Sequence, residues 1–208
     1  MKILFVASEG LPFSKTGGLA DVVEALPKAL VQMGHQVSVV LPRYRGTPPQ
    51  PVVMPSLSIP LGTEELRFPA ITGGAQGTGV RYYFVDDPAY FDREQLYAVQ
   101  GKDYPDNAER FAEFSRAAIE VAKLVVQPDV IHCHDWQSAL VPVLLRTAYE
   151  SDPALREVPV VFTVHNLGYH GLFPREILAR LGLAESLFQI EGLEFFGKVN
   201  FLKGGLVF

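Results

Sequence analysis

Four residues near the start of the chain, Lys15, Thr16, Gly17 and Gly18, have types and an order that suit binding of an anion. Glycine allows a ligand to approach the backbone closely, and the first turn of a helix presents unpaired N–H groups to a negative charge. The lysine adds a positive charge beside them. The order is neither that of a Walker A loop nor that of a GxGxxG motif. The alternative to an anion site is a flexible loop that leads into a helix and binds no ligand.

A second polar cluster, His134, Asp135 and Trp136, ends an apolar run of strand length. These side chains could bind a sugar, with the indole on an apolar sugar face and the polar groups on hydroxyls. In the alternative, which the residues alone favour, Asp135 caps the next helix and Trp136 fills the core. A zinc site made by His132, Cys133 and His134 is poor, because adjacent strand residues face opposite ways. We expect His132 and Cys133 to point away from His134.

A third cluster, His165 and Asn166, follows a run rich in β-branched residues. A histidine there could donate to a substrate oxygen or act as an acid or base. Alternatively, it is a polar residue whose bonds go to the loop backbone. The sequence contains no Ser/His/Asp order and no carboxylate pair that would indicate a hydrolase.

Strands that alternate with helices must position these three clusters. We predict strands at 2–8, 36–42, 81–87, 129–135 and 158–164, and helices at 19–33, 107–126 and 137–149, with helical pieces after 170. Pro27 should kink or split the first helix. We interpret residues 43–80 as an irregular β-hairpin insertion and residues 88–104 as a loop.

This alternation predicts an α/β fold, a Rossmann-like and mainly parallel sheet flanked by helices, with the β-hairpin as an insertion. Ligands of such sheets bind outside the carboxyl ends of the strands. All three polar clusters follow the carboxyl end of a predicted strand. Their convergence is the strongest indication of a binding or catalytic site.

Composition limits the classes of partner. The chain has 208 residues, 48% of them hydrophobic, and a net charge of −5. A nucleic-acid-binding protein would normally show a basic face. A single cysteine, Cys133, forms no disulfide within the chain, and no run of apolar residues is long enough for a signal sequence or a membrane span. We therefore expect a cytoplasmic protein that binds neither nucleic acid nor membrane.

Five blocks of the sequence together resemble the bacterial glycogen synthases and plant starch synthases. In order they are KILFVASEGLPFSKTGGLADVVEALPKAL, DNAERFAEFSRAA, HCHDWQSALVPVLL, TVHNLGYHGLF and KVNFLKGGL. The resemblance covers essentially the whole chain, and the combination of KTGGLADV with HDW and HN is far more specific than any one piece.

The resemblance implies the GT-B arrangement, in which two Rossmann-like domains face a deep cleft. Residues 1–208 would be the N-terminal starch synthase catalytic domain, without the C-terminal nucleotide-binding domain. The sequence stops within an apolar stretch, so we expect a fragment. The resemblance implies that it lacks even the last strand of the first domain and that it is inactive, or nearly so, alone.

The resemblance also implies the reaction. Glucose would pass from ADP-glucose, or UDP-glucose, to the non-reducing end of an α-1,4-glucan, with retention of configuration and with no metal or other cofactor. The competing hypothesis is a stand-alone α/β module that binds a glucan or a nucleotide without catalysis.

On the donor side, the resemblance implies that Lys15, Gly17 and Gly18 lie against the diphosphate and the transferred glucose. Asp21 would lie beside this loop. The anion suggested by the loop would then be the leaving nucleoside diphosphate.

The remaining residues would line the cleft. The resemblance implies that His165 lies close to the transferred glucose and that Asn166 helps to hold it. Asp135 and Trp136 would lie near donor and acceptor, with His165 and Asp135 as the catalytic pair. Many family members have histidine where this chain has Gln137, whose amide can bond a sugar hydroxyl but is not an acid or base.

Overall fold

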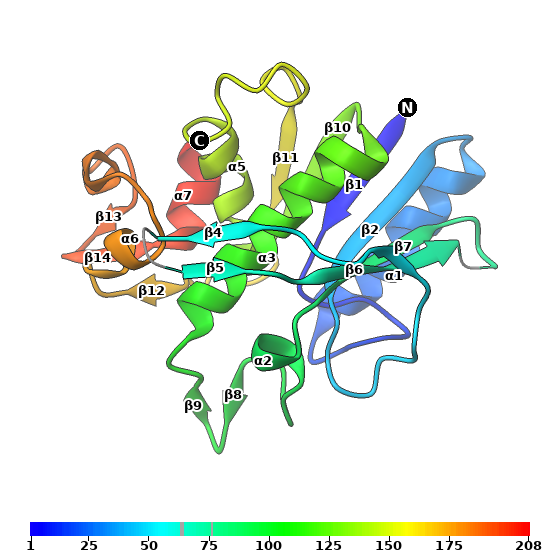
Figure 1. The fold of residues 1–208 in the computed structure, drawn as a ribbon, viewed down its shortest axis with the longest axis horizontal. Coiled ribbons are helices and arrows are strands. Elements are labelled where there is room, and N and C mark those ends of the chain that lie inside the picture. Colours follow the sequence, from blue (N-terminus) through cyan, green and yellow to red (C-terminus); the bar gives the residue numbers. More distant parts are fainter. Residues whose placement is uncertain (63–64, 76) are drawn as a thin grey trace.

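The computed structural model describes residues 1–62, 65–75 and 77–208, and within them the main sheet has seven strands (Figure 1). The strand order is β11-β10-β1-β2-β7-β6-β3. The bounds are β1 (Lys2–Val6), β2 (Gln36–Pro42), β3 (Val52–Met54), β6 (Ala70–Ala75), β7 (Arg81–Asp86), β10 (Val130–His134) and β11 (Val160–Thr163). The first five strands in this order run parallel, and β6 and β3 are antiparallel to their neighbours. The predicted α/β fold with a mainly parallel sheet is confirmed.

The central strands are apolar because helices cover both faces of the sheet. Alternation divides β1 between the two sides: Leu4 and Val6 face the side of α3 (Asn107–Val121), whereas Ile3 and Phe5 face α1 (Gly18–Gln32). The helical segment predicted at 107–126 is confirmed, although its last turn, η1 (Ala122–Val126), is a π-helix. Two hydrophobic layers thus enclose the sheet.

Two helix predictions need correction. Pro27 does not split α1, which continues across it as one helix with the proline buried. The helix predicted at 137–149 is too long, because α4 (Asp135–Ser138) and α5 (Leu140–Leu145) occupy its first part and turns follow.

The predicted insertion contains the expected hairpin, formed by β4 (Ile59–Leu61) and β5 (Glu65–Arg67). It also contributes β3 and β6, which extend the main sheet and were not predicted as part of it. Residues 63, 64 and 76 of the insertion lie outside the described residues. The segment predicted as a loop holds α2 (Pro88–Phe91) and the small hairpin of β8 (Ala98–Val99) and β9 (Lys102–Asp103).

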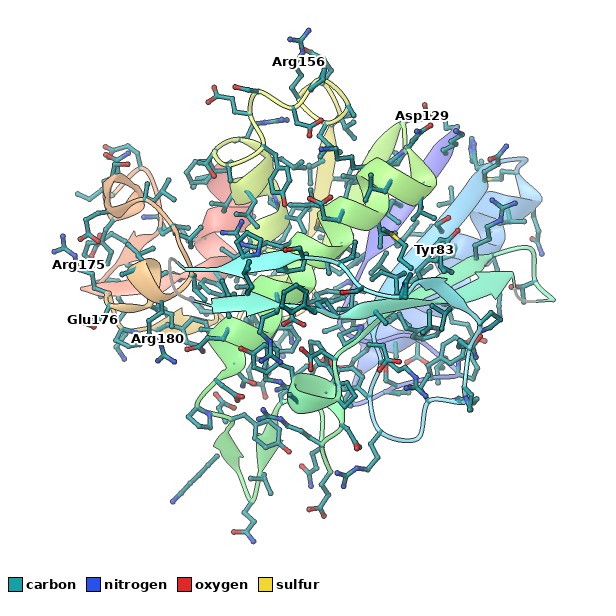
Figure 2. All side chains as sticks on the ribbon, viewed as in Figure 1. Tyr83, Asp129, Arg156, Arg175, Glu176 and Arg180 are labelled. Carbon is teal, nitrogen blue, oxygen red and sulfur yellow. The ribbon has the colours of Figure 1, made fainter. Side chains whose placement is uncertain are left out.

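The last forty residues are less helical than predicted, because they include a small antiparallel sheet. Its strands are β12 (Leu172–Phe173), β13 (Glu194–Phe195) and β14 (Lys198–Asn200), and its helices are α6 (Ile177–Arg180), η2 (Glu185–Leu187) and α7 (Phe201–Val207). Arg180, labelled in Figure 2, pairs with the buried carboxylate of Glu109 and ties α6 to α3.

Arg67 anchors the insertion hairpin to the domain through two carboxylates. Its guanidinium lies 2.5 Å from Oδ2 of Asp87 and 3.1 Å from Oε2 of Glu113 on α3. Burial, and next the charge of Asp87, raise the pKa of the Glu113 carboxyl from 4.5 to about 8, whereas Arg67 opposes the shift. The Glu113 carboxyl is therefore largely protonated at neutral pH.

This proton makes the stability of the protein depend on pH. Folded Glu113 retains a proton that unfolded Glu113 releases, so the free energy of unfolding should fall as pH rises from about 4.5 to about 8. The limiting slope for one such group is about 1.4 kcal/mol per pH unit. Glu113→Gln, which is neutral at every pH, should remove this part of the slope in unfolding curves measured across that range.

The matched control is Glu176→Gln, since Glu176 is exposed at the margin of the molecule (Figure 2). It should keep the slope of the unchanged protein. Equal slopes for all three proteins would show that Glu113 is ionised in the folded state.

Candidate active site at the carboxyl edge of the sheet

The order of the strands reverses between β1 and β10. From β1 the chain proceeds through β2 to β7 on one side, and α3 then returns it to β10 and β11 on the other side. Such a switch point leaves a crevice at the carboxyl ends of the strands, where ligands of α/β proteins bind. The segments that follow β1, β10 and β11 meet at this edge, so the structure brings the three predicted clusters together.

The KTGG loop, residues Lys15 to Gly18, leads into the N-terminus of α1. Gly18 is the first residue of α1, Gly17 precedes it, and no side chain caps the helix. The N–H groups of the first turn have no partners within the helix. A Cβ atom on either glycine would meet nothing within 4 Å. The loop therefore has the open space, and the first turn of α1 has the N–H groups, that an anion needs.

The predicted neighbours Lys15 and Asp21 form an ion pair, with Nζ 2.5 Å from Oδ1. Their side chains are 44% and 53% exposed, so solvent screens the attraction. An anion at the start of α1 would compete with Asp21 for the lysine.

Glu9 is a site residue that was not predicted from the sequence. It follows β1, is only 3% exposed, and its carboxylate is enclosed by the KTGG loop. It accepts hydrogen bonds from the backbone and the hydroxyl of Thr16, from the backbone N–H of Gly17 and from the hydroxyl of Tyr97. The rule that pointed to the ends of the other strands could have found Glu9, because it lies at the carboxyl end of the first one.

Asp135 and His165, the predicted catalytic pair, are in direct contact. Oδ1 of Asp135 accepts the backbone N–H of His165 at 2.7 Å, and the backbone N–H of Asn166 also donates to this carboxylate. Burial raises the pKa of the Asp135 carboxyl, and these two backbone donors oppose the shift. The carboxylate does not cap α4, as the structural alternative assumed, but holds the loop that follows β11.

Three imidazole rings form a stack beside this contact. The ring centroids of His132 and His134 are 4.2 Å apart, and those of His134 and His165 are 5.2 Å apart. The prediction that His132 points away from His134 is wrong, because residues two apart in a strand share one face. In the part of the chain that the structure describes, no three or more His, Cys, Asp or Glu side chains are placed so that they could hold a metal ion.

His134 is neutral and fixes the tautomer of His165. Burial, and next the neighbouring histidines, lower the pKa of His134 to about 2. Its Nδ1 lies 2.9 Å from Nε2 of His165, and its Nε2 is buried without a hydrogen-bond partner among the described residues. A proton on that buried Nε2 would be an unpaired donor, so we assign the proton to Nδ1, which donates to His165. A neutral His165 then carries its own proton on Nδ1.

The side chains of Trp136 and Gln137, which were expected to line the cleft, are buried. Trp136 is 8% exposed, and Phe111, Phe173 and Phe201 surround its ring. It fills the core, as one interpretation held, and little of its surface is left for a ligand. Gln137 is also buried, and its Oε1 has no hydrogen-bond partner in the part of the chain that the structure describes.

Asn166 is exposed, and its side chain folds back on its own loop. Its Oδ1 accepts the N–H of Gly168 at 2.8 Å, which shapes the turn after His165 and leaves the amide nitrogen for a ligand.

Gly171 provides a test of how closely the loop after β11 packs on Trp136. A Cβ at Gly171 would lie 2.5 Å from Cε3 of the indole, and the residue has a φ of +63°. Gly46 also has a positive φ, +87°, but open space around it. Gly171→Ala should therefore lower the free energy of unfolding by about 1–3 kcal/mol more than Gly46→Ala, because only the first adds a steric clash. Equal losses in denaturant unfolding would show that the two segments are not in contact.

Comparisons with known proteins agree with this geometry. The starch synthase catalytic domain family matches residues 2–208. A glycogen synthase of Koribacter versatilis is 57% identical over 211 residues, and glycogen synthase 2 of Geobacter metallireducens is 46% identical over 212 residues. Each alignment covers 100% of this chain but 43% of the relative, so the chain spans less than half the length of these proteins.

A solved structure is similar over nearly the entire chain. It is the catalytic domain of starch synthase IV from Arabidopsis thaliana bound to ADP and acarbose. The TM-score is 0.82 at 32% sequence identity, and the match covers 99% of this chain and 43% of the other.

Proposed function

The chain belongs to the starch synthase catalytic domain family, and from that premise we propose that it forms the N-terminal half of the active-site cleft of a retaining glucosyltransferase. The enzyme would transfer glucose from ADP-glucose to the non-reducing end of an α-1,4-glucan. Residues 1–208 would be the N-terminal domain of a GT-B enzyme, whose C-terminal domain completes the nucleotide pocket. The cytoplasmic location expected from the sequence is part of this proposal. No helix among the described residues has the length and apolar character needed to cross a membrane.

The observation that carries the proposal is the uncapped start of α1 beside Lys15 at the switch point of the sheet. Negative charge develops on the nucleoside diphosphate as its bond to the sugar breaks. Free N–H groups and a lysine fixed in advance stabilise such charge most effectively. A related catalytic domain has been solved with ADP bound, which supports a diphosphate as the anion and favours ADP-glucose over UDP-glucose.

The other groups would act on the sugar. His165 would lie beside the transferred glucose, with its backbone fixed by Asp135 and its ring fixed by His134. Asn166 would offer its amide nitrogen to a sugar oxygen, and Asp135 would add negative charge near the reacting carbon. Gly17 and Gly18 would let the diphosphate approach the backbone. The proposal assigns the stabilisation of charge to protein groups and uses no cofactor.

Lys15→Ala in the full-length parent enzyme tests the role of the lysine. Transfer of labelled glucose onto glycogen should lose about a hundredfold or more in kcat/KM for the donor, as when a donor to a developing anion is removed. The matched control is Lys28→Ala, which removes a lysine from the same helix whose partner is Glu24. Its rate should stay within about twofold of the unchanged enzyme, because a partly exposed ion pair one helical turn apart contributes little.

ADP-glucose and UDP-glucose should be compared in the same assay, together with the 208-residue chain alone. We expect preference for ADP-glucose and almost no transfer by the isolated chain. Equal effects of the two lysine substitutions would contradict the diphosphate site. A parent protein that binds glucan or nucleotide but transfers from neither donor would favour a binding module without catalysis.

A further inference from the structure

Glu9 is a buried carboxylate, and its hydrogen-bond donors among the described residues are all neutral. It is 3% exposed, and no lysine or arginine among the described residues pairs with it. Removing a charge from water is costly unless several hydrogen bonds compensate for the loss. Four donors from two separate segments provide that compensation, so the arrangement of those segments is tied to the position of this one carboxylate.

The two carboxylate oxygens have different partners. Oε2 accepts the backbone N–H groups of Thr16 and Gly17, the latter at 3.3 Å. Oε1 accepts the hydroxyl of Thr16 at 2.6 Å and that of Tyr97 at 2.7 Å. One oxygen therefore fixes the backbone of the KTGG loop, and the other joins that loop to the segment around Tyr97.

These two segments are the walls of a cavity of about 360 Å³, lined by Lys15, Thr16 and residues 94–98. Tyr97 is held from a second side as well, because Asn107 on α3 donates to its carbonyl at 2.9 Å. Glu9 thus connects both walls of the cavity to the end of β1, and through β1 to the centre of the sheet.

The position of Glu9 also determines which donors a ligand can use. The N–H groups of Thr16 and Gly17 are already bonded to Glu9, so those of the first turn of α1, from Gly18 onward, are left for the diphosphate. A carboxylate near an anion site weakens anion binding by repulsion. The carboxylate of Glu9 must therefore contribute something that offsets this repulsion.

We propose that Glu9 is a positioning residue, which holds the KTGG loop so that Lys15 and the start of α1 face the donor diphosphate, and which locks that loop to residues 94–98. Glu9 does not touch the substrate. The proposal rests on the proposed function, because it takes the diphosphate as the ligand of the loop.

Two substitutions in the full-length parent enzyme separate the effect of the side-chain length of Glu9, here called its reach, from the effect of its charge. Glu9→Gln keeps the reach: its carbonyl can accept the two backbone N–H groups, and its NH₂ can donate to the two hydroxyls. Glu9→Asp keeps the charge but withdraws it by about 1.5 Å, the length of one carbon–carbon bond. The matched control is Glu24→Gln, which removes a negative charge from α1 at a distance from the loop.

The dissociation constant of ADP and the KM for the donor should rise about tenfold or more in Glu9→Asp, because a shift of about 1 Å in a positioning group is costly. They should rise no more than about threefold in Glu9→Gln and stay unchanged in Glu24→Gln. Amide exchange at Thr16 and Gly17 without nucleotide should be faster in Glu9→Asp alone.

A Glu9→Asp enzyme that binds ADP within about twofold of the unchanged enzyme, with unchanged exchange at the two amides, would overturn the proposal. So would a Glu9→Gln enzyme that binds ADP more weakly than Glu9→Asp, because charge and not position would then matter. If the parent protein bound no ADP at all, the proposed function would fail, and the exchange rates alone would decide whether Glu9 holds the loop.

Discussion

The structure depends on one constraint, the parallel pairing of β1 with β2 on one side and with β10 on the other. Phe5 of β1 lies between Val39 and His132 in these two registers, with its ring against the imidazoles of the neighbouring strand. Because β1 and β10 run in the same direction, the chain leaves both strands at the same edge of the sheet. The residues that follow them, Glu9 and Asp135, are thereby brought to one crevice.

The carboxylates of Glu9 and Asp135 each hold a loop of the site in place. Each is placed by the end of a central strand, and each accepts backbone N–H groups from a neighbouring loop, Glu9 from residues 16–17 and Asp135 from residues 165–166. Both loops are therefore attached to the rigid centre of the sheet. A transferase benefits from this arrangement, because the stabilisation of a developing charge depends on groups that are oriented before the reaction begins.

The sequence was sufficient for the features that depend on periodicity and strand order. Apolar runs and helical spacing predicted the parallel strands, and the rule for strand ends brought Lys15 and His165 to one edge. The rule for strand ends also covers the position of Glu9, but its hydrogen bonds could not be predicted, because its partners lie 7, 8 and 88 residues further along the chain. Trp136 is buried by aromatic rings that are distant in the sequence, so the sequence could not decide between a sugar-binding and a core position for its indole. Strands of two or three residues, such as β12 and β13, are too short to show a period.

The central claim is that the N-terminus of α1 and Lys15 form a binding site for a diphosphate at the switch point of the sheet. A crystal structure of the full-length parent enzyme with ADP tests it most directly. The account predicts a phosphate oxygen within hydrogen-bond distance of the backbone N–H of Gly18 and of Nζ of Lys15, with the ion pair to Asp21 broken and the bonds from Thr16 to Glu9 intact. ADP bound elsewhere, with the pair between Lys15 and Asp21 unchanged, would contradict it.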